Sequence, residues 1–114
     1  MIARTGELET ENRMNMRSGN GCVNVAHWFK PEAFGARMRL CARLTIEPGA
    51  SIGTHAHEGE DEIYLVLSGT GRIFDDGAWS PIRAGDAILT GKGGSHSVEN
   101  NGDEPLVIAA VIIL

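Results

Sequence analysis

The sequence has few cysteines, few aromatic residues and no long apolar run. Two cysteines in 114 residues do not build a disulfide framework, so Cys22 and Cys41 are expected to be free thiols that pack as small apolar side chains. A reducing cytoplasm is then the expected location. The longest apolar run, residues 106–114, is less than half of the roughly 20 residues that a membrane-spanning helix needs. Residues 1–20 contain no apolar stretch typical of a secretion signal, so none is expected.

The sequence also lacks a cluster of positive charge. Ten Lys and Arg residues against 15 Asp and Glu residues give a formal net charge of −5, and the basic residues are scattered. Proteins that bind nucleic acids or anionic membranes usually concentrate basic side chains on one surface. We therefore expect neither nucleic acid nor membrane as a partner.

Residues 1–21 form a polar segment of mixed charge that ends in glycine-rich sequence. No apolar stripe marks a face that it would bury. The segment is predicted to be a flexible or loosely docked N-terminal arm. In the alternative, this arm crosses onto a partner subunit. Residues 22–114 are predicted to form the single folded domain.

From residue 22 onward the apolar residues follow the period of a β-strand. In residues 38–46 they occupy every second position, which predicts a half-buried strand. Further strands are expected at residues 23–29, 62–67, 72–75, 79–82, 87–89, 96–99 and 106–114, separated by turns rich in Gly, Asp and Asn. Asp76-Gly77 is a typical hairpin turn. Many short strands without a helical period predict an all-β barrel or sandwich of antiparallel strands.

Three of the four histidines fall in two glycine-bounded blocks. His55 and His57 are two residues apart, so on a strand both side chains share one face. Glu62 follows a short acidic loop, and His96 comes from a distant segment. Three imidazole nitrogens and one carboxylate oxygen suit one divalent transition metal ion per chain, such as Fe, Mn, Ni, Zn, Co or Cu.

These two blocks carry a family resemblance. The first block reads G-x5-H-x-H-x4-E-x6-G, and every fixed position is filled, by Gly49, His55, His57, Glu62 and Gly69. The second block resembles G-x5-P-x-G-x2-H-x3-N through Gly85, Gly93, His96 and Asn100, with Gly91 where proline is usual. Together they resemble the two motifs of the cupin superfamily, in particular its small single-domain (type-2) members.

The resemblance implies a jelly-roll β-barrel with a metal site inside. The ligands it implies are His55, His57, Glu62 and His96. Gly91 in place of proline is expected to loosen the loop that precedes His96 without removing the ligand. The alternative is a vestigial site, in which these side chains only form hydrogen bonds within the barrel.

Residues near the ligands are candidates for the pocket. Tyr64 lies two positions after Glu62, hence on the same face, and is predicted to line the pocket and to be a candidate catalytic proton carrier; core packing is the alternative. Met38 and Leu40 are expected to line the pocket or the core. A solvated sheet face or a dimer salt bridge is predicted for Arg37, Arg39 and Arg43. A solvated loop near the mouth of the metal site is predicted for Glu58, Glu60 and Asp61; in the alternative, this loop steers cations or discourages anionic substrates.

The strand that follows Glu62 also predicts an interface. If Glu62 faces the metal, then Ile63, Leu65 and Leu67 face outward. Together with the apolar C-terminal strand they form a patch that favours a homodimer. Small cupins commonly pair in this way, sheet to sheet.

The sequence leaves several functions open. A small metal-dependent enzyme acting on a small, weakly charged organic substrate is favoured, with dioxygenase-like chemistry because a metal with four protein ligands keeps open positions. The alternatives are a non-catalytic module that binds a small ligand or metal, a Lewis-acid isomerase or lyase, and a storage or structural barrel. A sugar-phosphate isomerase is disfavoured because the sequence has only Lys30 and Lys92 and an acidic loop near the site. A transcription factor is excluded because no segment predicts a pair of DNA-reading helices.

Overall fold

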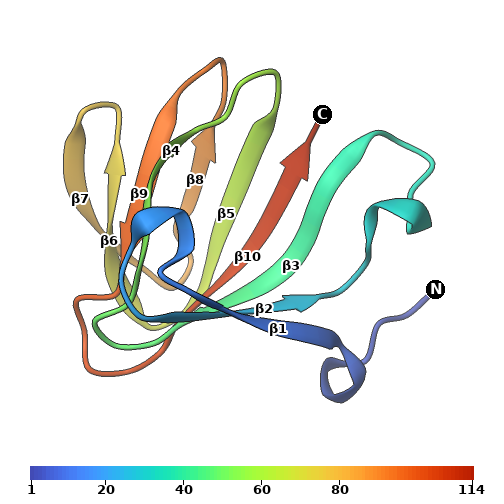
Figure 1. Cartoon of the computed structure of the whole chain (residues 1–114), viewed down its shortest axis with the longest axis horizontal. Helices are drawn as coiled ribbons and strands as arrows, with labels where there is room; N and C mark the ends of the chain where they lie inside the picture. The colour runs from blue at the N-terminus through green and yellow to red at the C-terminus, as the bar shows by residue number, and fades with distance from the viewer.

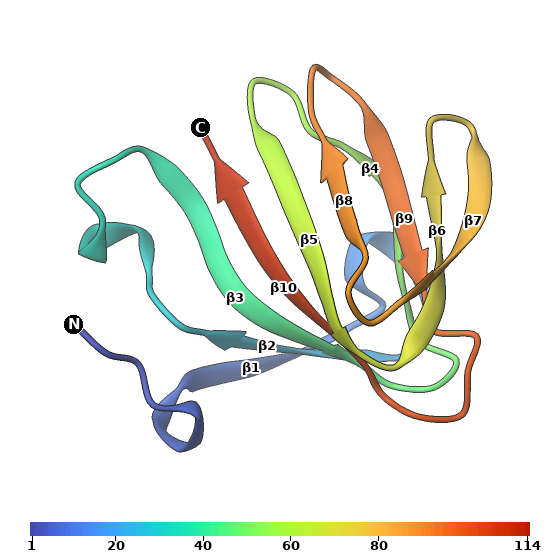
Figure 2. The ribbon, with the colours of Figure 1, turned by 180° about the vertical axis from the view of Figure 1, so that it is seen from behind.

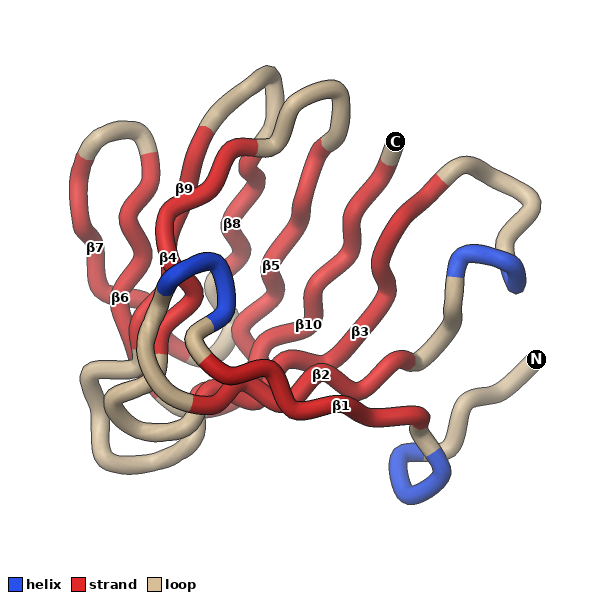
Figure 3. Tube along the Cα trace, in the orientation of Figure 1, coloured by secondary structure: helices blue, strands red, loops and turns tan.

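Ten strands in two antiparallel sheets make up the fold (Figure 1). The structure, a computed structural model, describes all 114 residues. The strands are β1 (Glu9–Met14), β2 (Cys22–His27), β3 (Met38–Ile46), β4 (Ser51–Ala56), β5 (Asp61–Ser68), β6 (Thr70–Asp75), β7 (Ala78–Arg83), β8 (Ala87–Thr90), β9 (Ser95–Glu99) and β10 (Leu106–Ile113). Three short 3-10 turns, η1 (Thr5–Glu7), η2 (Met16–Ser18) and η3 (Pro31–Ala33), are the only helical elements (Figure 3). None is long or apolar enough to cross a membrane.

The two sheets face each other as a curved sandwich. The larger sheet has the order β1-β2-β3-β10-β5-β8, and the smaller has the order β4-β9-β6-β7. Figure 2 shows from behind how the smaller sheet packs over one half of the larger one. The predicted all-β jelly-roll architecture is confirmed. Both cysteines are free thiols, as predicted.

The apolar core fills one end of the sandwich. Leu44, Ile46, Ile52, Leu106 and Ile108 are fully buried there. Burying each such side chain contributes about 1.5–3 kcal/mol. The register of β5 and β10 pairs Val66 with Ile108 in this core and Glu62 with Ile112 toward the other end. The core therefore holds the strands in place, and the polar site lies at the opposite end of the same strands.

The N-terminal segment joins the larger sheet. Strand β1 pairs with β2 over its whole length, from Glu9 opposite His27 to Met14 opposite Cys22. All six residues of β1 are exposed, so the strand has no apolar alternation by which to recognise it. The chain then turns through η2, which packs beside β4 (Figure 1). Residues 1–21 thus supply an edge strand and a turn to the sandwich, which the sequence analysis did not predict.

Strand β3 contains a bulge near its start. Leu40 lies opposite Ile112, but Met38 lies opposite Ile113, so Arg39 is an extra residue in the ladder. An extra residue bends the strand and changes the direction of the neighbouring side chains. This irregularity decides where Arg39 points.

The outer face of the larger sheet is apolar and uncovered in the single chain. Leu65, Leu67 and Leu89 are 44%, 48% and 67% exposed. Ile63 of β5 is half-buried and lies directly between Leu89 of β8 and Val111 of β10, so these side chains form one row. The outward patch that the sequence predicted is present on the surface.

Candidate metal centre

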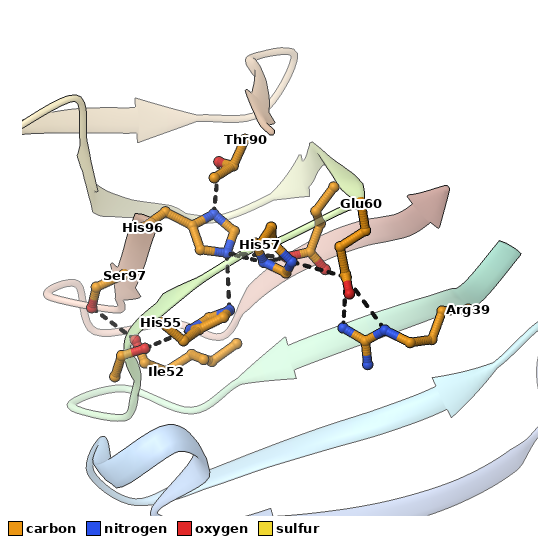
Figure 4. A network of polar contacts seen from close by, with 10 residues as sticks. Arg39, Ile52, His55, His57, Glu60, Thr90, His96 and Ser97 are labelled. Atoms are coloured by element: carbon orange, nitrogen blue, oxygen red, sulfur yellow. Dashed lines mark hydrogen bonds and ion pairs between the residues drawn. The ribbon is translucent and has the colours of Figure 1, made fainter. Parts of the chain in front are cut away.

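The four predicted ligands meet at one point inside the sandwich. His55 lies on β4, His57 directly after it, Glu62 on β5 and His96 on β9, and their ligand atoms all lie within 4.8 Å of one another. The Nε2 atom of His96 is 3.0 Å from the Nε2 atoms of both His55 and His57. Glu62 Oε1 lies 2.9 Å from His57 Nε2 and 3.0 Å from His96 Nε2. Figure 4 shows the three imidazole rings turned toward one another.

Each imidazole has a partner for the nitrogen that points away from the centre. His55 Nδ1 lies 2.7 Å from Gly53 O, His57 Nδ1 lies 3.0 Å from Glu60 Oε2, and His96 Nδ1 lies 2.9 Å from Thr90 Oγ1. A carbonyl and a carboxylate oxygen can only accept hydrogen bonds. His55 and His57 therefore carry their proton on Nδ1 when neutral, and their Nε2 lone pairs face the centre.

The centre contains more lone pairs than hydrogen atoms. Glu62 Oε1 is fully buried and has no hydrogen-bond partner, although two imidazole nitrogens lie within 3.0 Å. A buried carboxylate oxygen without a donor is destabilising, and bare lone pairs at this distance repel one another. A cation at the centre satisfies all four atoms at once. The residues therefore fit a divalent transition metal ion. In a purely hydrogen-bonded vestigial site, a proton on His96 Nε2 satisfies at most one of the three neighbouring acceptors, Glu62 Oε1 and the Nε2 atoms of His55 and His57.

Three of the four metal ligands, His55, His57 and Glu62, open into a small pocket that three arginines also line. The pocket has a volume of about 160 Å³, which is room for about five water molecules. Its arginines are Arg13 of β1, Arg17 of η2 and Arg39 of β3. The expectation of a weakly charged substrate stays a prediction. The pocket adds three cationic side chains that the sequence pattern did not place there, and Arg13 and Arg39 are paired with carboxylates of the chain.

Two of the three predicted pocket residues line this space. Leu40 and Tyr64 do so, whereas Met38 is buried but lies beyond the bulge of β3 and does not line the pocket. The Tyr64 ring stacks on the His96 ring, with centroids 4.9 Å apart and planes inclined by 20°. Burial raises the pKa of Tyr64 well above its usual range, and the negative charge of Glu62 raises it further. The phenol therefore keeps its proton and is a hydrogen-bond donor; its catalytic role stays a prediction.

The acidic loop contributes one residue to the site. Glu60 Oε2 accepts hydrogen bonds from Arg39, at 2.8 Å from Nη2 and 3.3 Å from Nε, and also contacts His57 Nδ1 (Figure 4). The hydrogen bond from Arg39 lowers the pKa of Glu60, so the carboxylate is ionised at neutral pH. Arg39 is exposed, as predicted, whereas the Glu60 side chain is only 15% exposed and contacts a metal ligand. The bulge in β3 turns Arg39 toward the pocket, and Glu60 orients a metal ligand.

The departure from the second motif has a local explanation. A Cβ atom at Gly91 would lie 1.9 Å from Asp61 Oδ1, so the carboxylate of Asp61 occupies the space that a proline ring needs. The loop is held nonetheless, because Gly94 N–H donates to Gly91 O and His57 N–H donates to Gly94 O, both at 3.0 Å. Glycine at this position therefore accommodates a neighbouring side chain, and hydrogen bonds tie the loop to the segment that carries His57.

Comparison with known proteins agrees with this architecture. Residues 42–112 match the family model described as Cupin domain. The chain belongs to the cupin family. The cupin is 47% identical to the oxalate-binding protein of Thermotoga maritima, across 100% of this chain and 94% of that protein.

Solved structures extend the likeness. The crystal structure of a predicted oxalate decarboxylase from Thermotoga maritima, also 47% identical, superposes with a TM-score of 0.97 and covers 100% of this chain and 99% of that one. KdgF from a Halomonas species is 16% identical and superposes with a TM-score of 0.79, covering 100% of this chain and 95% of that one. This more distant likeness concerns the fold alone. The family predicted from the two motifs is confirmed.

Proposed function

We propose that this cupin binds oxalate, or a dicarboxylate of similar size, at a divalent transition metal ion held by its three histidines and Glu62. The observation that carries the proposal is that Arg13, Arg17 and Arg39 line the same pocket as the metal ligands. Guanidinium groups form strong, often bidentate hydrogen bonds with carboxylates. The name of the oxalate-binding relative from Thermotoga maritima supports this ligand.

Three groups of residues would make different contributions to binding: the metal ligands, the apolar wall of the pocket and the arginines. When bound, the metal ion supplies a Lewis acid with positions open to oxygen donors. The hydrogen bonds at Nδ1 keep the imidazoles oriented toward it. Leu40, Leu44 and Ile112 form the apolar wall of the pocket and exclude water, which strengthens every charge interaction inside. The arginines balance the ligand charge that the metal does not neutralise.

A decarboxylase is the second candidate, and the protonated phenol of Tyr64 in the pocket favours it. Cleavage of the carbon–carbon bond of oxalate releases carbon dioxide and leaves an electron pair on the remaining carbon. A proton must reach that carbon to give formate, and Tyr64 is a proton carrier in the pocket. Dioxygenase-like and isomerase or lyase chemistry stay predictions from the open metal positions.

The test begins with the metal. Elemental analysis of the purified protein identifies the ion, and calorimetry then measures oxalate binding to the metal-loaded and the chelator-treated protein. We expect saturable binding to the loaded protein only. Absence of binding to the loaded protein, or equal binding after the metal is removed, would contradict the proposal.

The same sample separates a binder from an enzyme. Labelled oxalate is incubated with the loaded protein under air and under argon, and formate, carbon dioxide and oxygen consumption are measured. Unchanged oxalate indicates a binding protein. Formate produced in both atmospheres indicates a decarboxylase, and oxygen uptake indicates an oxygenase or oxidase.

We also propose that the cupin forms a homodimer through the outer face of the larger sheet. Leu89, Ile63 and Val111 form one row across this face, and the exposed side chain of Leu65 lies beside it, two residues along β5 from Ile63. A contiguous apolar patch of this kind is typical of a protein interface. Light scattering at micromolar concentration should give the mass of two chains. The mass of one chain would contradict the proposal.

A further inference from the structure

The turn that carries Arg17 has an unusual backbone. Asn15, Arg17 and Ser18 have φ angles of 52°, 54° and 65°, so three non-glycine residues within four positions are left-handed. Residues other than glycine rarely adopt this backbone conformation, because their Cβ atom crowds the following carbonyl oxygen. Such residues persist where the surroundings hold them, and they are frequent at functional sites.

Strand β4 holds this turn in place. A Cβ atom at Gly53 would lie 2.0 Å from Arg17 O, and one at Gly19 would lie 2.3 Å from Ser51 O, so the two backbones are in direct contact. Ser51 N–H donates to Asn20 O at 2.8 Å, and Asn20 N–H donates to Ser51 Oγ at 2.9 Å. The turn is thereby fixed to the strand that carries the first metal ligand.

Arg17 differs from the other two pocket arginines in its partners. Arg13 pairs with Glu11, and Arg39 pairs with Glu60. The guanidinium of Arg17 has neither a carboxylate partner nor a hydrogen bond within the chain, although it lines the pocket. It is the pocket arginine whose charge is free to meet an anion.

Arg17 also lies beside the metal centre. It lines the same pocket as His55 of β4 and as Glu62 and Tyr64 of β5. Arg17 is therefore near side chains on two different strands that face the metal centre.

We infer that Arg17 is the specificity-determining residue of the pocket, and that the left-handed turn places its guanidinium against the carboxylate oxygens that the metal does not hold. This inference rests on the proposed function and adds to it the group that distinguishes a dicarboxylate from a monocarboxylate. A monocarboxylate has its only charged group at the metal and leaves Arg17 without a partner. Oxalate presents anionic oxygens to both the metal and Arg17.

The test compares oxalate with acetate in the metal-loaded protein by calorimetry. In Arg17→Gln the affinity for oxalate should fall about 10- to 100-fold, the value of a hydrogen bond to a charged group. Acetate affinity should change by less than about twofold, and the metal content should stay the same. Arg17→Lys should recover part of the loss, because it keeps the charge and loses the fork of donors. Arg4→Gln, in the same segment but outside the pocket, is the matched control and should bind oxalate as the wild type does.

A second variant tests the turn without removing the arginine. Gly19→Ala brings a methyl group against Ser51 O and should lower oxalate affinity while the metal content and the melting temperature show a folded barrel. Oxalate binding by Arg17→Gln at wild-type affinity, or an equal loss of acetate, overturns the assignment of Arg17. Wild-type affinity in Gly19→Ala overturns the positioning by the turn. Failure of the proposed function is distinct, since the loaded wild-type protein then binds no oxalate at all.

Discussion

The metal ligands and the pocket arginines come from regions of opposite character. His57, Glu62 and His96 are 1–3% exposed and sit on or beside strands anchored by the core. The arginines sit on an exposed edge strand, on a left-handed turn and at a bulge. The contrast supports the proposed division within the fold, in which the buried strands hold the metal ligands and peripheral elements supply the side chains that would select the bound anion.

Substitution of the buried metal ligands should have the largest effect, which is loss of the bound metal. His55→Ala/His57→Ala removes two of four donors, and elemental analysis should find no bound metal. His96→Ala should lose more metal than Glu62→Gln, which keeps an oxygen at the same place. His27→Ala is the matched control, because the fourth histidine lines the pocket outside the cluster and its loss should leave the metal content unchanged. Full metal occupancy in the double variant would contradict the assignment of the ligands.

Acid should remove the metal without any substitution. The folded-state pKa of His55 lies below its ordinary value of 6.5 because of burial. The unfolded chain therefore takes up its proton first, and the contribution of His55 to stability is present above pH 6.5 and is lost as the pH falls toward the lowered pKa. Protons also compete with the metal for the imidazoles, so dialysis below about pH 6 should release it. Full retention at about pH 4, where free imidazoles are protonated, would contradict a histidine site.

Glu60 contacts both a metal ligand, His57, and a pocket arginine, Arg39. Its substitution should lower metal affinity less than the loss of a ligand does. Glu60→Gln removes the ionised acceptor of His57 Nδ1 and the partner of Arg39. Metal affinity should fall about 10- to 100-fold, as is usual for a lost partner of a metal-ligating histidine. Glu58→Gln, in the same loop, is the control and should have wild-type affinity. Competition with a coloured chelator measures both, and equal affinities would show that the contact with His57 is unimportant.

Substitutions on the outer face of the larger sheet should have the smallest effect on metal content and oxalate affinity. Leu65→Glu/Leu89→Glu places charges on the apolar patch and should convert the homodimer to monomers in light scattering. Metal content and oxalate affinity should stay within about twofold of wild type, because these side chains point away from the pocket. Thr70→Glu, on the smaller sheet, is the control and should remain dimeric. A dimer that persists in the double variant would place the interface elsewhere.

The sequence predicted the buried region well because its signals are local. The spacing of His55, His57 and Glu62 is imposed by the period of a strand and one short loop, and β3 shows its period of two directly. Strand β4 was not marked as an element of its own, since Gly53 and Thr54 interrupt any apolar alternation. The type of each ligand residue then identified the metal site.

The peripheral region was not predictable in the same way. β1 carries no buried side chain, so its pairing with β2 leaves no trace in the apolar pattern. The bulge at Arg39 reverses the face that a strict period of two assigns to it. The pocket arginines come from three elements whose proximity only the folded chain reveals, so positive charge beside the metal ligands was not predictable from the sequence.

A crystal structure of the metal-loaded protein with oxalate tests the central claim most directly. We predict one metal ion on His55, His57, Glu62 and His96, with oxalate bound to the metal and the Arg17 guanidinium on its remaining carboxylate oxygens. Oxalate bound away from the metal, or bound to it with Arg17 directed into solvent, would contradict the proposal that buried strands hold the metal and that Arg17 selects the ligand.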